Sequence, residues 1–583
     1  MRIERLSHWV LMSVFLLVAF SVPFHFAPIG FFIEEATAAA AVVLGGALAW
    51  ACMGNSRSVS AVLPLWCLWG VVLALSYING DYSLNTAALW ALVYWSIGCL
   101  VIVWFSRLHE VFGYRRAIEG IASLMVLALV IQAILGVAKF YGLLRFINIP
   151  EQASSRMPGL LNQANVTSCF VTVGLISVIF LSLRQRLGMA FQLVLAWMAG
   201  SVLFLTGTRA VWGYFFIIGI AALVVVLRGR DSFVGRKLIQ SVCVACIGVV
   251  VAFFSQSSLD HGLTRIAPDD LRGGTIERAD FTRSATELGL RPTEFAKVWH
   301  GAFEQPWFGV GINNYPYFSF RMDSEVTDPI RSGHLVTHSH NIFSMILAEQ
   351  GLVGLVTFLV MALWLAFRIF RLEKNAEWFW VASILGVFFL FSNVEFPLWY
   401  LHYLVLFLGV LTFALPAVRF TINSRLVAVG CSAAVLITFL SLGASVAPGF
   451  YVFASAYLNP GWDQERVQQV HAWRSSSLIG PYGDLLVYKY LLPTEGGYQQ
   501  QLNRVQRVIE WRPQGPALST KIMLLALMDR DKEACRFAEK AVPFMPSIAK
   551  RVKADLARLE EQYDVELDPV ERCLSDLSKA YDE

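Results

Sequence analysis

Long apolar runs separated by short polar loops are the dominant pattern of this chain. A helix needs about 20 mostly apolar residues to cross a bilayer, and thirteen stretches of the sequence meet this requirement. They cover approximately residues 8–29, 36–53, 61–78, 87–105, 117–141, 164–183, 189–206, 210–227, 238–255, 341–367, 378–394, 398–415 and 426–446. The pattern predicts an all-α, polytopic membrane protein with about 13 transmembrane helices.

The first of these runs follows Arg2 and Arg5, as the apolar core of a signal peptide would. Its apolar part is longer than the roughly 7 to 15 residues of such a core. We therefore interpret it as an uncleaved membrane anchor.

Two polar regions divide the chain into four parts. Residues 1–255 contain the first nine predicted helices, residues 256–340 form a large loop, residues 341–446 contain the last four helices, and residues 447–583 form a polar tail. The tail has helical periodicity at residues 464–478, 498–511, 515–528, 532–543 and 547–562. The stretch from Trp511 to Pro546 is similar to one helix-turn-helix unit of the tetratricopeptide kind. We expect a C-terminal helical domain that either caps the membrane part or docks a protein partner.

The short loops differ in charge between the two sides of the membrane. Seventeen Lys and Arg residues fall on one side, and only Lys139, Arg145, Arg156 and Arg209 fall on the other. Because Lys and Arg are retained in cytoplasmic loops, the N-terminus is expected in the cytoplasm, and the large loop and the tail on the far side. Cys535 and Cys573 would then lie in an oxidising compartment and are candidates for a disulfide.

Composition agrees with a membrane protein and excludes several functions. Hydrophobic residues make up 56% of the chain, charged residues 15%, and the mean hydropathy is +0.58, so a soluble protein is excluded. The net charge of +4, without a basic run, gives no reason to expect a nucleic-acid partner. No phosphate-binding G-x-x-x-x-G-K-[ST] loop is present, so ATP is not expected to drive the protein.

Polar residues gather where several helices meet the far side. In RMPGLLNQANVT, the residues Asn162 and Gln163 precede the sixth predicted helix, where they either cap it or serve a function. In the short turn TGTR, Arg209 either extends its charge to the lipid headgroups or binds a phosphate through its planar fork of donors.

The stretch HLVTHSHNIFSMILAEQG carries the strongest chemical signal. His334, His338, His340 and Asn341 lead into the tenth predicted helix, and Glu349 follows inside it. The positive end of a helix dipole favours a neutral imidazole, which can act as a base near neutral pH. Zinc binding by the three histidines and plain surface histidines are the alternatives, but H-x₃-H-x-H is not a recurrent zinc spacing.

A fourth cluster, SNVEFPLWYLHY, places Glu395, Tyr400 and Tyr403 at a turn on the same side. The four clusters together predict one shared cavity. An enzyme that acts there without a nucleotide needs a substrate already activated, and lipid-diphosphate-linked sugars fit this requirement.

At these residues the chain resembles the bacterial protein O-oligosaccharyltransferases of the pilin-glycosylating type, within the O-antigen ligase and polymerase superfamily. The resemblance covers about residues 150 to 550 and rests on LLNQANVT, LTGTRAVW, RPTEFAKVWHGAFEQPWFGVGINNY, THSHNIFSMILAEQG, EFPLWYLHY and the tail that begins WRP. It implies transfer of a preassembled oligosaccharide from undecaprenyl diphosphate to a Ser or Thr hydroxyl of an exported protein. It also implies a metal-independent enzyme without cofactors, in the inner membrane of a Gram-negative bacterium, with its active site in the periplasm.

The resemblance assigns roles to five residues. Arg209 and Arg291 would bind the diphosphate, while Gln163, His340 and Glu395 would form the catalytic group, with His340 as the base or as a phosphate ligand. The family usually has Glu-Tyr-Pro where this chain has Glu395-Phe396-Pro397, so any role of that phenol must pass to Tyr400 or Tyr403, or be dispensable. The usual Arg-x-x-x-Trp reads Arg291 to Phe295 here, which keeps the charge and an aromatic ring.

Two other enzymes and one transporter remain as alternatives. An O-antigen ligase or an O-antigen polymerase would use the same donor, but neither needs a long helical tail to receive a folded protein. A polyisoprenoid transporter would place charges along a path through the membrane rather than at one face. With the function that the resemblance implies, the expected partners are the lipid-linked oligosaccharide, the acceptor protein and membrane lipids.

Overall fold

The chain is almost entirely helical. The computed structural model describes residues 2–53, 56–145, 156–229, 231–267, 291–326, 335–421, 425–459, 461–476, 478–564 and 567–581. Helix accounts for 79% of the chain and strand for 1%. The expected all-α fold is confirmed.

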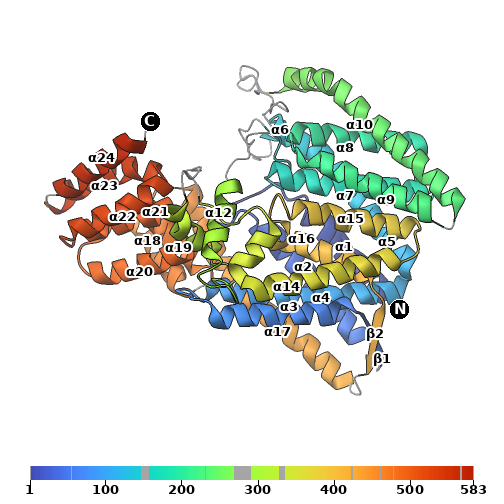
Figure 1. Cartoon of the computed structure of the whole chain (residues 1–583), viewed down its shortest axis with the longest axis horizontal. Helices are drawn as coiled ribbons and strands as arrows, with labels where there is room; N and C mark the ends of the chain where they lie inside the picture. Colours follow the sequence, from blue (N-terminus) through green and yellow to red (C-terminus); the bar gives the residue numbers. More distant parts are fainter. Residues whose placement is uncertain are drawn as a thin grey trace.

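A bundle of long apolar helices forms the body of the molecule (Figure 1). Among the described residues, ten helices or helix pairs are long and apolar enough to cross a membrane: α2 (Phe32–Cys52), α3 (Val62–Asn79), α4 (Thr86–Phe112), α5 (Tyr114–Ile131) continuing through η2 (Gln132–Gly136) into α6 (Val137–Phe140), α7 (Ala164–Leu183), α8 (Met189–Thr206), α9 (Ala210–Arg228), α10 (Ser232–Ile266), α14 (Ile342–Arg371) and α17 (Arg425–Leu458). Two shorter apolar helices, α15 (Ala376–Phe391) and α16 (Leu401–Ala414), pack among them. The chain is a multi-pass membrane protein.

The first predicted span, residues 8–29, is not one continuous helix. α1 (Arg2–Ser13) continues only through the π-helical turn η1 (Val14–Val18). Pro23 and Pro28 follow, and proline lacks the N–H that would continue a helix. Hydrophobicity alone does not reveal this interruption.

α10 and α17 extend beyond the apolar runs that predicted them. The run at 238–255 is part of a helix that ends at Ile266, and the run at 426–446 is part of one that ends at Leu458. The expected boundaries at residues 256 and 447 therefore fall inside helices. Apolar runs report the thickness of the bilayer, whereas a helix continues until its backbone hydrogen bonds end.

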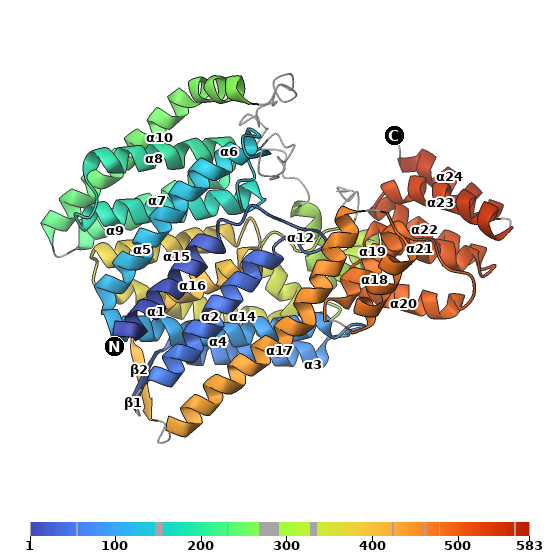
Figure 2. The same ribbon diagram turned by 180° about the vertical axis from the view of Figure 1, so that it is seen from behind.

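A small sheet, which the sequence did not predict, joins two turns of the bundle. β1 (Ser56–Ser60) pairs antiparallel with β2 (Ala417–Thr421), with Ser58 opposite Arg419. The sheet lies at the end of the bundle that faces away from the C-terminal helices (Figure 2).

α7 is the central helix of the bundle. Its apolar window is 94% buried, and it packs against α5, α8 and α15. Within the membrane it is held by a hydrogen bond from Trp380 Nε1 to Ser177 Oγ (3.0 Å). The polar residues just before α7 are therefore attached to the most deeply buried of these membrane helices.

The tail forms a helical domain at one end of the bundle (Figure 1). It consists of α18 (Gln464–Ser476), α19 (Gly480–Tyr490), α20 (Tyr498–Trp511), α21 (Gly515–Ala526), α22 (Asp531–Phe544), α23 (Ser547–Tyr563) and α24 (Asp568–Tyr581). Its hydrophobic core continues into the membrane part, where Phe32 of α2 stacks on Phe450 of α17 with ring centres 3.9 Å apart. The domain is therefore packed onto the bundle.

Between this domain and the bundle lie the described helices of the large loop (Figure 1). They are α12 (Arg291–Gly301), α13 (Tyr315–Met322) and the 3₁₀ turn η4 (Asp323–Glu325). A buried ion-pair group holds them together, because Lys297 Nζ lies 2.8 Å from both Glu294 and Asp323. α12 is thereby fixed against α13.

We predict that the end bearing the C-terminal domain faces the periplasm. Reporter fusions after residues 110, 186, 232, 372 and 422 should report cytoplasm, and fusions after 300 and 500 should report periplasm.

Cys535 and Cys573 in the tail give a second readout of this orientation. The Cys573 thiol hydrogen-bonds the Cys535 thiol, and burial together with this neighbour raises the pKa of Cys573 to about 12. Mass mapping without reduction should find the two thiols joined. A cytoplasmic signal at 500 would contradict the orientation.

Candidate active site

The first turn of α14 is tied to the turn that follows α15. Asn341 caps α14, since its Oδ1 accepts from the backbone N–H groups of Phe343 (3.0 Å) and Ser344 (3.2 Å). Its Nδ2 donates to Asn393 Oδ1 at 3.0 Å. His340, just before the cap, has a left-handed φ of 57°, which is uncommon for a residue other than glycine. This cap fixes the position of the histidines relative to Glu395.

Two histidines converge on one carboxylate. The rings of His338 and His340 lie 4.1 Å apart. His338 Nε2 is 3.6 Å and His340 Nδ1 is 3.8 Å from Glu395 Oε2. Both distances exceed a hydrogen bond, and neither ring nitrogen has a hydrogen-bond partner among the described residues. The structure thus brings His338, His340 and Glu395 together, as the sequence predicted.

Glu395 is oriented by a hydrogen-bond chain from α7 and the turn before α9. Asn165 Nδ2 donates to Glu395 Oε1 at 2.5 Å. Arg156 in turn donates to Asn165 Oδ1 (2.8 Å), to Thr208 Oγ1 (2.9 Å) and to the carbonyl of Thr206 (2.7 Å). The buried carboxylate therefore has one oxygen fixed by an amide and the other directed toward the histidines.

The surroundings lower the pKa values of both His340 and Glu395. Burial, the nearby His338 and the charge of Arg291 lower the pKa of His340 to about 4, against the opposing effect of Glu395. Burial raises the pKa of Glu395, but its contacts with His338, His340 and Asn165 outweigh burial and lower it overall. Near pH 7, the site contains a neutral His340 beside an ionised Glu395.

Arg291 is held beside this group by the start of α12. One guanidinium nitrogen donates to the carbonyl of Val394 at 3.0 Å, which places its charge next to Glu395. The side chain is otherwise exposed. A guanidinium in this position can bind an anion with its remaining donors.

The other predicted residues border the same network. Gln163 precedes α7, and its Oε1 accepts from the Tyr400 hydroxyl at 3.4 Å. Asn162 before it has a left-handed φ of 55°, which turns the chain into the helix. Arg209 is exposed and directly follows Thr208, whose hydroxyl belongs to the network.

The replacement of the expected tyrosine by Phe396 has a structural explanation. The ring of Phe396 stacks on His338 (4.7 Å between centres) and on Trp399 (4.0 Å). These stacks need an aromatic face and no hydroxyl. Phe396 therefore supports the orientation of His338.

One predicted supporting residue does not join the group. Tyr403 is fully buried, and its hydroxyl donates to the carbonyl of Val166 at 2.7 Å, so Tyr403 belongs to the core rather than to the site. Its apolar neighbours along α16 explain the burial. His334 lies outside the described residues.

Glu349 anchors the large loop on a break in α14. Gly351 has a non-helical φ of 64°, which leaves neighbouring backbone groups without helical partners. The loop supplies them, because Gly311 N–H donates to the Glu349 carbonyl (3.0 Å) and Leu352 N–H donates to the Pro306 carbonyl (2.7 Å). The G-V-G-I-N segment thus docks the loop on α14.

Gly351→Ala is expected to destabilise the protein by about 2 kcal/mol or more. Alanine is strained at this φ, and its Cβ would collide with the Trp307 backbone. Thermal unfolding in detergent measures the effect. Gly219→Ala in α9 is the matched control, since nothing lies within 4 Å of an added Cβ there. Equal unfolding temperatures for the two variants would contradict this role of the break.

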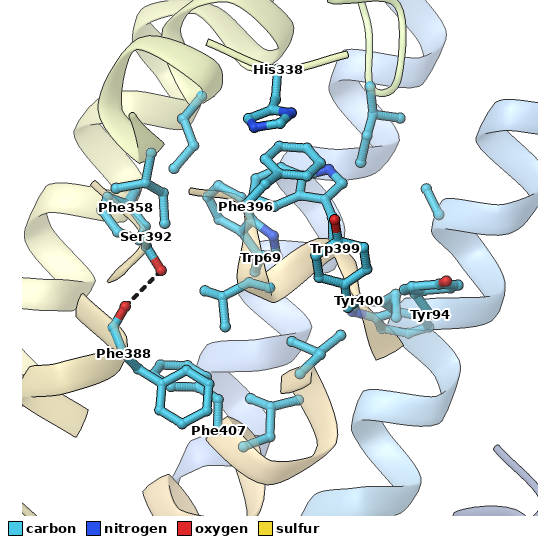
Figure 3. Close-up of a pocket in the computed structure, with 18 of the residues that line it drawn as sticks. Trp69, Tyr94, His338, Phe358, Phe388, Ser392, Phe396, Trp399, Tyr400 and Phe407 are labelled. Atoms are coloured by element: carbon cyan, nitrogen blue, oxygen red, sulfur yellow. Dashed lines mark hydrogen bonds between the residues drawn. The ribbon is translucent and has the colours of Figure 1, made fainter. Parts of the chain in front are cut away.

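A large cavity opens beside the histidines. It has a volume of about 1010 Å³ and is lined by α2, α3, α4, α14, α15 and α16. Figure 3 shows His338, Phe396 and Trp399 at one end, Phe388 and Phe407 toward the other, and Tyr94 and Tyr400 together at its side. Along α14 the lining reaches from Ile342 to Phe370, about 40 Å at the rise of an α-helix.

The histidine group also has the composition of a metal site. His338, His340 and Glu395 each offer one ligand atom, and these atoms lie within 4.8 Å of one another. This set differs from the three histidines that the sequence suggested as a zinc alternative. Nitrogen and oxygen ligands of this kind suit a divalent cation, so a chelator experiment distinguishes a metal site from a metal-free one.

Sequence reasoning missed the residues that orient Glu395. Asn165 and Arg156 stood in the polar cluster before α7, and Thr208 stood in the T-G-T-R turn, but none was assigned a role. The available signal was their position in the same two short polar segments as Gln163 and Arg209. Their partners are distant in sequence, so the contact itself had no local signature.

Comparison with known proteins agrees with this arrangement. Residues 193–359 match the family model described as O-antigen ligase, and residues 379–556 match the one described as virulence factor membrane-bound polymerase, C-terminal. No curated protein matches the chain. The matches span α8 to α14 and α15 to α23, which include His338, His340 and Glu395. The chain therefore belongs to the O-antigen ligase superfamily, whose members transfer lipid-linked glycans.

Proposed function

We propose that this protein transfers a preassembled glycan from undecaprenyl diphosphate to a Ser or Thr hydroxyl of an exported protein, such as a pilin, in the periplasm. The observation that carries the proposal is the C-terminal helical domain packed over the end of the cavity nearest to the histidine group. A folded acceptor that docks on this domain reaches the site directly. Joining two glycans needs no such surface.

The cavity suits the lipid part of the donor. Its lining is mainly aliphatic and aromatic along the membrane-spanning length of α14, as a polyisoprenoid chain requires. His338 lies at one end of this lining (Figure 3). A lipid diphosphate would therefore lie with its tail in the bundle and its charged group at the histidines.

Arg209 and Arg291 would bind the diphosphate. In the transfer the bond between the anomeric carbon and the diphosphate oxygen breaks, and negative charge develops on the leaving group. Donors fixed in advance at that position lower the barrier most effectively. Arg291 is fixed in this way by the Val394 carbonyl.

His340 would accept the proton of the acceptor hydroxyl while the hydroxyl oxygen bonds to the anomeric carbon. Its lowered pKa keeps the ring neutral at pH 7, which is the form that can accept a proton. The arriving diphosphate adds negative charge nearby and so raises this pKa. Gln163 would hydrogen-bond the sugar or the phosphate.

The pH dependence of transfer is expected to follow His340. Because its pKa in the free protein is about 4, the basic form persists as the pH falls through 6.5, the usual value for histidine. The acid limb of kcat/KM, which reports the free enzyme, should therefore lie well below 6.5. A limb at the ordinary histidine value would contradict a buried His340 as the base.

Co-expression with a lipid-linked glycan pathway and candidate pilins tests the proposal. Intact-mass analysis of the pilin should show the added glycan only when this protein is present. Pilins of unchanged mass, together with glycan on lipid A core or lengthened glycan, would favour the second candidate. That candidate is an O-antigen ligase or polymerase, which the descriptions of the two matching family models favour.

A further inference from the structure

The C-terminal domain contributes side chains to the wall of the cavity. Tyr482 of α19, together with Trp511 and Arg512 at the end of α20, lines it along with residues of the bundle. Tyr482 and Trp511 meet edge to face with ring centres 5.1 Å apart. The Arg512 guanidinium lies 5.5 Å from the Tyr482 ring and 5.0 Å from the Trp511 ring. Docking of an acceptor on the outer surface of the domain gives these side chains no role.

Across the cavity, α4 and α2 present a matching set of groups. Trp90 and Tyr94 of α4 line the same end of the cavity as Glu35 of α2. The Tyr94 hydroxyl donates to Glu35 Oε2 at 2.6 Å, which leaves a carboxyl group and a phenol beside aromatic faces. Tyr482 lines the same cavity from the C-terminal domain, so the two sets of side chains border one space.

The two walls are held at a fixed separation. Trp90 packs against the hydrophobic core of the C-terminal domain. The Ser83 hydroxyl, in the loop before α4, donates to Glu510, the residue directly before Trp511. The aromatic end of the cavity is therefore preformed rather than assembled on binding.

This end of the cavity lies next to the proposed catalytic group. Tyr400 lies beside Tyr94 in the cavity wall (Figure 3), and its hydroxyl hydrogen-bonds Gln163. A continuous path therefore leads from Gln163 past Tyr400 and Tyr94 to Tyr482 and Trp511. Whatever is attached to a diphosphate at the histidines extends along this path.

The chemistry of this end fits a saccharide. A sugar ring has C–H faces, which pack on the electron-rich faces of aromatic rings, and a rim of hydroxyls, which bond to carboxyl, phenol and guanidinium groups. A polyisoprenoid tail would offer no acceptor to the Arg512 guanidinium, which is costly inside a cavity.

We propose that Trp90, Tyr94, Tyr482, Trp511 and Arg512 form a saccharide-binding subsite for the distal sugars of the donor glycan. The C-terminal domain then selects the glycan as well as receiving the acceptor. The inference rests on the proposed transfer of a lipid-linked glycan, and it assigns the Trp-Arg-Pro segment at 511–513 a role in donor recognition.

Donors of different length test the subsite. Full-length protein in proteoliposomes is given synthetic undecaprenyl diphosphates that carry either one or three N-acetylated hexose units. Trp511→Ala and Arg512→Gln should each raise KM for the three-sugar donor about tenfold, as the loss of one aromatic or charged contact does. KM for the one-sugar donor and for the acceptor should change by less than about twofold, since these ligands do not reach Trp511.

Trp462→Ala is the matched control. Trp462 belongs to the same domain and pairs with Tyr490 at 5.3 Å, away from the cavity lining, so both KM values should stay at the wild-type level. Arg512 is only partly buried, so Arg512→Gln decides the outcome if Trp511→Ala unfolds.

The outcomes separate the subsite from the proposed function. Equal KM increases for both donors, or an increase only for the acceptor, would overturn the subsite. Equal KM values for the one-sugar and three-sugar donors with the wild-type protein would also overturn the subsite, but they would leave the proposed transfer reaction intact. A wild-type protein that transfers neither donor would contradict the proposed function as well.

Discussion

His340→Ala is expected to lower glycan transfer about 10²- to 10⁴-fold, the usual contribution of a general base. His340 Nδ1 lies 3.8 Å from Glu395 Oε2 and beside the charge of Arg291, and under the proposed function it accepts the proton of the acceptor hydroxyl. Alanine removes this proton acceptor but leaves the Asn341 cap of α14 intact. Initial rates in proteoliposomes with a lipid-linked glycan measure the loss.

His338→Ala is the control for this variant. His338 stacks on Phe396 and lines the cavity, so its loss should reduce transfer less than the loss of His340. A metal held by His338, His340 and Glu395 predicts a different result, namely comparable losses for both variants and abolition by a chelator. We expect activity to survive the chelator.

Arg291→Lys and Arg209→Lys should each lower transfer about 10²-fold, as removal of one preorganised donor to a developing charge does. Lysine retains the positive charge but cannot form the planar, bidentate contact that suits a diphosphate. At position 291 it also loses the geometry that anchors the side chain on the Val394 carbonyl. Expression and membrane insertion should be unchanged, because a lysine at the interface can still extend to water.

Arg265→Lys provides the comparison for these two variants. Arg265 is exposed near the end of α10 and contacts His261, outside the network around Glu395. Its replacement should leave the rate unchanged. Wild-type rates for Arg209→Lys and Arg291→Lys would show that neither guanidinium binds the leaving group.

Apolar periodicity predicted most of the bundle because the bilayer imposes a fixed length on each span. The run at 189–206 coincides with α8, and the run at 164–183 with α7. The interruption after α1 depends on prolines within an apolar run, and the sheet between β1 and β2 pairs turns that are distant along the chain. Neither the interruption nor the sheet changes the average hydrophobicity of the surrounding sequence, so apolar periodicity does not predict them.

The helical tail was also predicted in part. Amphipathic periodicity correctly located α20 at 498–511, whereas α19 and α24 were not identified. Mixed apolar and small residues such as Gly480 and Gly483 hide the period of α19, because that helix is buried on several sides. A resemblance to tetratricopeptide units remains a prediction.

The candidate site illustrates why sequence patterns reveal residues more readily than contacts. The sequence indicated His340 and Glu395 separately, because each is polar at the end of an apolar run. The bond between Asn165 and Glu395 joins residues 230 positions apart, and only the packing of α7 against α15 brings them together. Phe396 was noted as a departure, but its stack on His338 requires the fold.

Intact-mass analysis of a pilin acceptor in a purified, reconstituted system decides whether this protein glycosylates a protein acceptor. Proteoliposomes should contain only this protein, an extracted undecaprenyl-diphosphate-linked glycan and the pilin. We expect the pilin to gain the mass of one complete glycan with the wild-type protein and to gain none with His340→Ala. An unchanged pilin mass with the wild-type protein, while the same preparation consumes the donor to extend free or lipid-linked glycan, would contradict this expectation.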